Sequence, residues 1–244
     1  MRSCIFVDGE NLRHSLIDLF AGEFDPQDYL PKTARWHEFF DFLAANCYSS
    51  EKLRAYWYVV GKVDFWPWNL PHSINDHQKL VNILRKHDPF AKALNAAANE
   101  RTCAENILHD LEDEQRKIEK RFHGWLTLQN GIVGQHDEVE FRRAGTIHYN
   151  LCTRRFGSEK AVDVKLSIDM LHLKDIYDVA VIVSGDGDYV PAVQVIKDCG
   201  KKVVNVSFET RSGDLLPGGA RTLNQITDKV LTVKYNQIKP LLLP

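Results

Sequence analysis

Two short apolar runs that each end in an acidic glycine turn constrain the fold of this chain most strongly. Residues 3–7 (SCIFV) lead into Asp8-Gly9, and residues 179–183 (VAVIV) lead into the sequence SGDGD at 184–188. Apolar runs of this length, bounded by turn residues, are typical of strands that are buried on both faces. Such strands belong to parallel sheets covered by helices, so the two runs predict an α/β fold.

Predicted helices and strands alternate along the rest of the chain. Apolar side chains at helical spacing predict a helix over 34–46, and the aromatic and β-branched segment 54–60 predicts the next strand. Later strands are predicted over 138–149, 203–208 and 230–235, and a loop over 61–73, which contains glycine and proline. This order predicts a mainly parallel, helix-covered central sheet.

From about Asn99 to Phe122 the sequence has a different pattern. A narrow apolar stripe runs along a highly charged predicted helix and consists of Ile107, Leu108, Leu111, Ile118 and Phe122. A stripe of this kind is typical of a helix with one packed face. We therefore interpret residues 1–244 as a single domain with a helical insertion at about 90–135, which either packs on the core or makes a homodimer contact.

Charge and cysteine content narrow the choice of partner and compartment. The formal net charge is −2, so any polyanionic partner has to be held by local patches. The five cysteines are scattered and form no CxxC pair, which favours reduced thiols over disulfides or a zinc site. The first predicted strand begins almost at Met1, and no apolar run approaches the roughly 18 residues of a membrane span. We expect a cytoplasmic protein with no signal peptide and no membrane partner.

The acids at the two strand ends predict a cation site. Ligand sites in open α/β sheets form at the carboxyl ends of strands, so Asp8 would meet Asp186 and Asp188 if their strands are neighbours. Clustered carboxylates repel one another unless a cation neutralises them, and oxygen ligands suit Mg²⁺ or Mn²⁺. A simpler interpretation stays open, in which these acids only cap turns and helices.

Four segments resemble the NYN domain, a branch of the PIN-like nuclease superfamily, and most of all its LabA-like group. They are FVDGENL (6–12), KAVDVKLSIDML (160–171), VSGDGDYVPAV (183–193) and GKKVVNVSF (200–208). The resemblance implies a three-layer PIN-like, Rossmann-like sandwich and a metal-dependent (endo)ribonuclease. It also implies a helix over 160–173, although VDVKLSIDM alternates apolar and polar residues with the period of a strand.

The resemblance further implies a set of site residues. Its catalytic and metal-binding acids are Asp8, Asp163, Asp186 and Asp188, and its supporting residues are Asn11, Lys160 and Ser184. Bound Mg²⁺ or Mn²⁺ would activate water for attack on an RNA phosphodiester. On the implied helix, Asp163 and Ser167 share a face because they are four positions apart, whereas Asp169 points elsewhere.

A weaker signal concerns contacts with RNA. The candidates are the basic pairs Arg142-Arg143 and Arg154-Arg155, together with Trp66 and Trp68 in the predicted loop. Arginines of this kind contact backbone phosphates, and exposed indoles stack on unpaired bases, so the expected partner is single-stranded RNA. Solvated surface charges and indoles packed beneath a proline-rich loop are the simpler interpretation.

Two other classes of protein remain alternatives. A haloacid-dehalogenase-like phosphatase also has a first-strand aspartate and a late acidic motif, and Lys160 would match its lysine. That family uses Asp-x-Asp where this chain has Asp-Gly-Glu, no Ser or Thr ends the strand RAYWYVV, and Asp163 would have no role. The third alternative is a non-catalytic PIN-like RNA-binding module, against which the full set of acids argues. No G-x-G-x-x-G follows the first strand, which argues against a dinucleotide site.

Overall fold

The computed structural model describes residues 1–25, 28–68, 70, 75–217 and 220–244. Contacts divide the chain into two compact units. Unit 1 comprises Met1–Val59, Thr127–Ala144 and Ala161–Pro244, and unit 2 comprises Val60–Leu126 and Gly145–Lys160. Unit 2 thus overlaps the segment that we predict as an insertion at about 90–135, but it begins earlier and also takes in a second stretch of chain.

Strands and helices alternate along unit 1. Its elements are β1 (Arg2–Asp8), α1 (Gly9–Leu19), α2 (Trp36–Asn46), the first part of β2 (Glu51–Trp66), the last part of α5 (Glu100–Gln135), the first part of β3 (Val139–Asn150), α6 (Val162–His172), β5 (Val179–Val183), the 3-10 helix η2 (Gly187–Tyr189), α7 (Val190–Asp198), β6 (Lys202–Glu209), β7 (Leu215–Leu216), α8 (Arg221–Ile226), β8 (Lys229–Lys234) and α9 (Tyr235–Leu242). The strands predicted from the apolar runs are all present. The segment with a strand-like period forms the helix α6, as the resemblance implies.

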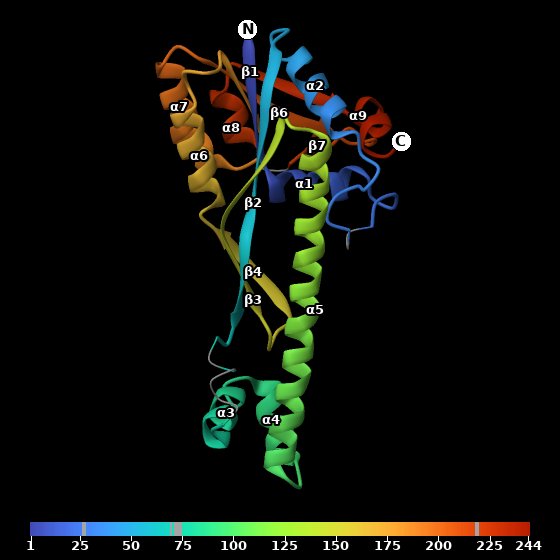
Figure 1. Cartoon of the computed structure of the whole chain (residues 1–244), viewed down its shortest axis with the longest axis vertical. Helices are drawn as coiled ribbons and strands as arrows, with labels where there is room; N and C mark the ends of the chain where they lie inside the picture. The colour runs from blue at the N-terminus through green and yellow to red at the C-terminus, as the bar shows by residue number, and fades with distance from the viewer. Residues whose placement is uncertain (26–27, 69, 71–74, 218–219) are drawn as a thin grey trace. The chain divides into compact units, whose positions relative to one another are not determined.

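The central sheet is mostly parallel, which confirms the predicted α/β fold. Its eight strands include the path β4-β3-β2-β1-β5-β6-β7, where β4 is Arg155–Lys160, and β8 also pairs with β6. The strand β1 pairs in parallel with both β2 and β5, and β6 pairs in parallel with β5 and β8. In Figure 1, α6, α7 and α8 lie on one side of the strands of unit 1, and α1, α2 and α9 lie on the other.

The innermost strands are β1 and β5. All five residues of β5 are buried, and β1 is buried from Ser3 to Asp8. Full burial is expected for strands covered by helices on both faces, and each buried valine or isoleucine contributes about 1.5–3 kcal/mol. The core of unit 1 therefore fixes the two strand ends that carry the predicted acids.

Two segments differ from the sequence prediction. The loop predicted over 61–73 is wrong as far as Trp66, because β2 continues to that residue. The strand continues because Val63 and Phe65, two positions apart, both pack against the core of unit 2. Positions 69 and 71–73 of the predicted loop lie outside the described residues. The strand β4 has the sequence RFGSEK, whose apolar content is too low to predict a strand.

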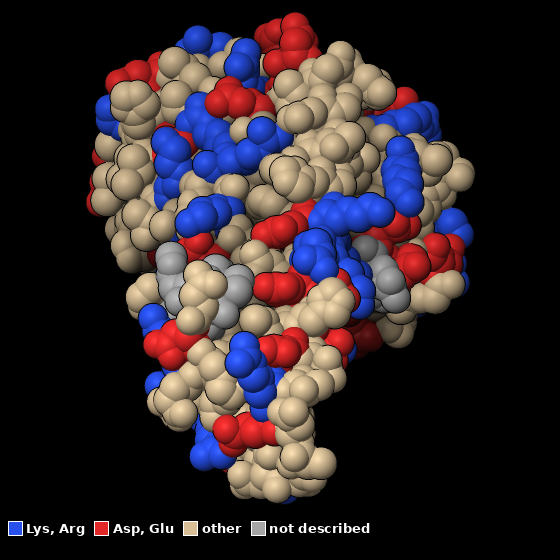
Figure 2. All heavy atoms as spheres, turned by 60° about the horizontal axis from the view of Figure 1, so that its bottom comes forward, with Lys and Arg blue, Asp and Glu red and all other residues tan. Residues whose placement is uncertain are grey.

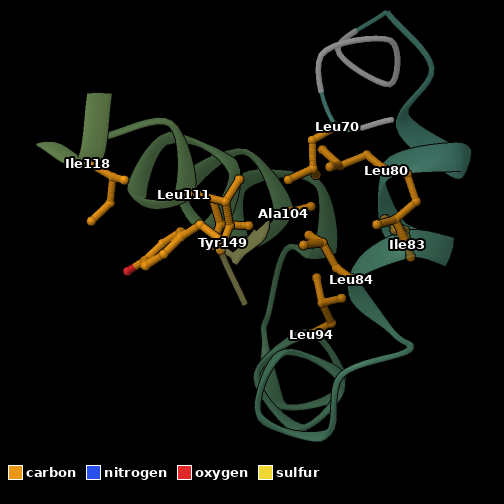
Figure 3. Close-up of a cluster of buried hydrophobic side chains, with 11 residues drawn as sticks. Leu70, Leu80, Ile83, Leu84, Leu94, Ala104, Leu111, Ile118 and Tyr149 are labelled. Carbon is orange, nitrogen blue, oxygen red and sulfur yellow. The ribbon is translucent and has the colours of Figure 1, made fainter. Parts of the chain in front are cut away.

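Unit 2 has a hydrophobic core of its own (Figure 3). Its elements are the last parts of β2 and β3, the strand β4, the helices α3 (His77–Leu84) and α4 (Asp88–Ala96), and most of α5. Leu111 and Ile118 of the predicted stripe are buried in this core together with Leu84, Leu94 and Tyr149. The stripe is therefore covered within the chain, and the structure gives no support to the predicted homodimer contact.

Two further expectations concern compartment and chemistry. In the part of the chain that the structure describes, no helix combines the length and the apolar character needed to cross a membrane. All five cysteines are free thiols. Burial raises the pKa of Cys4 to about 12 and that of Cys47 to about 11, so these two thiols are poor nucleophiles at neutral pH.

Candidate functional site

Asp8 lies at the junction of β1 and α1 and is only 3% exposed. It is the N-cap of α1, because its Oδ1 accepts a hydrogen bond of 3.2 Å from the backbone N–H of Asn11. Val7 lies opposite Val183 in the parallel pairing of β1 with β5, so Asp8 and Ser184 leave adjacent strands at the same edge of the sheet. The expected adjacency of the two strand ends is therefore confirmed.

The second oxygen of Asp8 is surrounded by donors. Its Oδ2 accepts hydrogen bonds from Asn11 Nδ2 at 2.7 Å, Ser184 Oγ at 2.9 Å and Tyr189 OH at 3.0 Å. Burial raises the pKa of the Asp8 carboxyl, and these hydrogen bonds oppose that rise only in part. The carboxylate is thus held in one orientation, in a place where its negative charge is poorly solvated.

Asn11 and Ser184 also fix the turn that carries the later acids. Oδ1 of Asn11 accepts a hydrogen bond of 3.2 Å from the N–H of Gly185, and Ser184 Oγ accepts one of 3.1 Å from the N–H of Asp186. Gly185 is required here, because a Cβ at this position would lie 2.3 Å from Cγ of Pro217. The two supporting residues predicted from the sequence therefore join the start of α1 to the turn after β5.

Asp186 and Asp188 occupy the start of η2. Asp186 is the N-cap of this 3-10 helix, and its Oδ1 accepts a hydrogen bond of 2.9 Å from the N–H of Asp188. Capping is therefore a real role of Asp186, as it is of Asp8. The hypothesis of a functional site has to rest on features that capping does not explain.

One such feature is a hollow that joins two of the acids. Asp163 in the first turn of α6 lines it together with Ser167 and Asp188, and its volume is about 370 Å³. The sharing of a face by Asp163 and Ser167 agrees with the helical register predicted from the sequence. The apolar wall of the hollow includes Ile168 of α6 and Val195 of α7, both of which are about half exposed.

Tyr189 contacts the candidate site but is not among the residues predicted from the sequence. Its side chain is buried, and burial raises the pKa of its hydroxyl far above the ordinary value. The charges of Asp8, Asp186 and Asp163 raise it further. Of the four predicted acids, Asp8 contacts this hydroxyl directly, through the hydrogen bond to its Oδ2. The available signal was its place directly after the acidic turn, in the segment SGDGDY.

The predicted acids differ from Asp169 in how their charge is balanced. Among the described residues, no Lys, Arg or His forms a salt bridge with Asp8, Asp163, Asp186 or Asp188. Asp169 is buried but pairs with Lys165 at 2.8 Å and with Arg142, and it accepts a hydrogen bond from Tyr58 OH. Burial alone would raise the pKa of Asp169, but these partners lower it overall. Asp169 is thus a paired structural acid.

The donor set fits a hard cation in its chemistry, because every predicted ligand supplies carboxylate oxygen. Within the described ranges, however, no three His, Cys, Asp or Glu side chains are grouped closely enough to hold a metal ion. The four acids therefore form an uncompensated acidic region, and their side chains are not gathered into a ready-made metal centre.

Glu10 and Lys160 lie in different surroundings. Oε2 of Glu10 forms an ion pair along α1 with Arg13 at 3.6 Å and lies 3.7 Å from Nε2 of His14, which pairs with it when the imidazole is protonated. Burial raises the pKa of Glu10, and the Arg13 charge opposes the rise. Lys160 is exposed at the end of β4, where it pairs with Thr146 of β3 within unit 2.

The residues predicted to contact RNA fall in both units. In unit 1, Arg142 pairs with Glu140 and Asp169, and Arg143 donates hydrogen bonds to Gln129 and Asn130. In unit 2, the exposed residues are Arg154, Arg155, Trp66 and Trp68. On the face drawn in Figure 2, basic and acidic side chains are interspersed, in keeping with the formal net charge of −2.

Comparison with known proteins identifies the class. A model of the NYN domain matches residues 2–217, so the chain belongs to the NYN domain family. A search among curated proteins finds no match. The chain is also similar to the crystal structure of a protein of unknown function from Vibrio parahaemolyticus, with 19% sequence identity over 95% of this chain and 92% of that one and a TM-score of 0.44.

Proposed function

We propose that this protein is a metal-dependent ribonuclease that cuts single-stranded RNA internally. NYN domains are typically nucleases of the PIN-like kind, which supports a phosphodiesterase. The observation that carries the proposal is the uncompensated acidic region. Ser184 bonds both to Asp8 and to the N–H of Asp186, Asp163 and Asp188 line one hollow, and none of the four acids has a described cationic partner. Such a set of carboxylates calls for a divalent cation.

The residues of the site have separate roles in this proposal. Asp8, Asp163, Asp186 and Asp188 would hold Mg²⁺ or Mn²⁺, which when bound would supply water activation and stabilise the charge that develops on the phosphate. Because the acids are not gathered in advance, their side chains have to come together as the cation binds. Asp8 is the fixed member, since its two oxygens are oriented by four hydrogen bonds.

The hollow between α6 and α7 offers a place for the substrate next to two of the acids. Asp163 and Asp188 lie on its lining, and its wall is largely apolar. A sugar or base flanking the scissile phosphate could lie against Ile168 and Val195 while the phosphate faces the acids. Ser167, on the same face of α6 as Asp163, adds a hydroxyl to this lining.

The test is cleavage of single-stranded RNA in Mg²⁺ or Mn²⁺. We expect internal cleavage that EDTA stops and products with a 5′-phosphate and a 3′-hydroxyl, because the attacking group is water. Asp8→Asn and Asp186→Asn should each abolish cleavage. Asp175→Asn is the matched control, since Asp175 is a highly exposed aspartate outside the site. Full activity of the Asp8 and Asp186 variants would exclude the site.

The phosphatase alternative makes the opposite prediction for Glu10. There, Glu10 would be needed beside the metal, whereas the structure pairs it with Arg13 and His14 along α1. We expect Glu10→Gln to retain most RNA cleavage and the protein to leave a small phosphomonoester intact. Hydrolysis of the phosphomonoester with RNA left whole would favour the phosphatase. Inertness towards both substrates, with RNA still bound, would favour the non-catalytic module.

A further inference from the structure

Unit 2 carries a row of aromatic side chains contributed by four different elements. The rings of Phe65 in β2 and Tyr149 in β3 have centroids 6.1 Å apart. Tyr149 contacts Phe156 of β4 at 4.8 Å, and Phe156 in turn contacts Trp125 of α5 at 6.4 Å. Residues far apart in sequence thus form one continuous row, which we call the aromatic row.

The Phe65 end of the aromatic row opens into a pocket of about 600 Å³. Its lining includes Trp66, Trp68 and His148 in addition to Phe65. Trp66 is 47% exposed and Trp68 is 67% exposed, which is unusual for indole side chains. The volume falls in the range of about 300–1,000 Å³ that is typical of small-ligand sites.

The row is held rigidly by the core beneath it. Tyr149 is buried among the leucines of unit 2, and in Figure 3 its hydroxyl points away from them. That hydroxyl donates a hydrogen bond of 2.6 Å to Oε1 of Glu114. The N–H of Leu151 donates one of 2.8 Å to the carbonyl oxygen of Trp66, which fixes the strand end that carries the exposed indoles.

Positive charge flanks the aromatic row. Arg154 lies in the short connection (151–154) between β3, which carries Tyr149, and β4, which carries Phe156. Arg155 opens β4 opposite Asn150 of β3. Arg154 and Arg155 are exposed, so their guanidinium groups are accessible to phosphates.

We propose that unit 2 holds a second RNA contact, a platform on which unpaired bases stack on Trp66 and Trp68 while Arg154 and Arg155 take the flanking phosphates. Single-stranded nucleic acid fits this surface because π-faces bind bases of any sequence and cations bind the strand between them. Gln115 and His148 at the pocket can pair with base edges. The acid in the lining, Asp64, is paired with Lys62 at 2.5 Å. The choice of RNA as the nucleic acid rests on the proposed function.

Binding of a short 5′-fluorescein-labelled oligouridylate, measured by anisotropy in EDTA, tests the platform without cleavage. We expect Trp66→Ala and Trp68→Ala each to weaken binding about 5-fold or more, and Trp68→Phe to retain most of it, because stacking needs a ring. Arg154→Ser with Arg155→Ser should lower the slope of log affinity against log salt by about 0.7 for each lost phosphate contact. Arg101→Ser, which changes an exposed arginine paired with Glu105 in the same unit, is the matched control and should bind as the parent does.

A second measurement covers the case in which an indole variant fails to fold. Unlabelled oligouridylate should quench the tryptophan fluorescence of the parent, and an RNA duplex should bind much more weakly, because its bases already stack on each other. Folded Trp66→Ala and Trp68→Ala proteins with unchanged affinity would overturn the platform, as would tight binding of the duplex. If the protein cleaves RNA but the Trp66 and Trp68 substitutions leave its affinity for oligouridylate unchanged, the platform is rejected and the proposed ribonuclease is not. If the substitutions weaken binding but the parent protein does not cleave RNA, the proposed ribonuclease is rejected and the platform is not.

Discussion

The hydroxyl of Tyr189 donates a hydrogen bond of 3.0 Å to Oδ2 of Asp8, although 181 positions separate the two residues. The bond joins the carboxyl end of β1 to the 3-10 helix that follows β5. It acts on Oδ2 of the most buried of the predicted acids, whereas the capping bond from the N–H of Asn11 is accepted by Oδ1. Tyr189 is therefore a positioning residue for Asp8 in the proposed site.

Tyr189→Phe tests this positioning role, because it removes the hydroxyl and leaves the buried ring. We expect the free energy of unfolding to fall by about 1.5–3 kcal/mol, the usual contribution of a hydrogen bond to a charged group. RNA cleavage should fall with kcat reduced more than KM changes, since Asp8 loses orientation. Urea unfolding and cleavage kinetics give the two values. If the variant is less stable but keeps the kcat of the parent, the hydrogen bond contributes to stability only and the positioning role is contradicted.

Gly185→Ala tests the packing of the acidic turn. The new Cβ would lie 2.3 Å from Cγ of Pro217, so the turn has to shift, at a cost of about 1–3 kcal/mol in unfolding free energy. Gly187→Ala is a matched control two residues later, because nothing lies within 4 Å of the position of its Cβ. We expect the control to unfold at or slightly above the parent midpoint in urea. Equal stability of both variants would contradict the close contact with Pro217.

The ion pairs of Asp169 predict a dependence of stability on pH. Asp169→Ala should lower the free energy of unfolding at pH 7 by about 3 kcal/mol, because it leaves a buried ion pair without its carboxylate. We expect the low end of the usual range because Lys165, one of the two partners, is 45% exposed and its charge is screened by solvent. The partners of Asp169 hold its pKa below the ordinary value despite burial. Its contribution is therefore complete above the unfolded pKa of about 3.9 and is lost as the pH falls through the lower folded pKa. The difference between parent and variant should shrink in acid, and a difference that grows below pH 4 would contradict the ion pairing.

A divalent cation should stabilise the folded protein, because only the folded chain links Asp8 and Asp186 through Ser184 and places Asp163 and Asp188 on one hollow. We expect Mn²⁺ to raise the melting temperature of the parent in a concentration-dependent way. The rise should be smaller for Asp186→Asn and unchanged for Asp175→Asn. Scanning calorimetry with and without EDTA measures both. A rise of equal size in all three proteins would place the cation outside the acidic region.

Part of this site could be predicted from the sequence, because two of its acids stand directly after recognisable strand segments. Asp8 and Asp186 each follow an apolar run, and parallel strands end at one edge of a sheet, so their approach follows from the pattern. The contact of Tyr189 with Asp8 could not be predicted in this way, since a hydrogen bond over such a separation leaves no periodic signal. The pairing of Arg142 with Asp169 is likewise a tertiary contact, and it gives a structural role to an arginine that the sequence places among the RNA contacts.

The strands of the fold likewise differ in how well the sequence predicts them. The strand β5, with the sequence VAVIV, is evident because burial on both faces demands an unbroken apolar run. The last part of β2 was predicted as a loop, because its glycine and the nearby proline are typical of loops. It forms a strand because Val63 and Phe65 pack on the core of unit 2. Local signals therefore fail where packing between distant segments decides the structure.

The most direct test of the central claim is anomalous X-ray scattering from crystals of the protein soaked in Mn²⁺. The claim is that the acids of β1, η2 and α6 together hold the cation that hydrolysis needs. It predicts an anomalous peak within bonding distance of carboxylate oxygens of both Asp8 and Asp186, and loss of that peak in Asp186→Asn crystals. A peak elsewhere on the molecule, with these two carboxylates still bound only to Asn11, Ser184, Tyr189 and the η2 backbone, would contradict it.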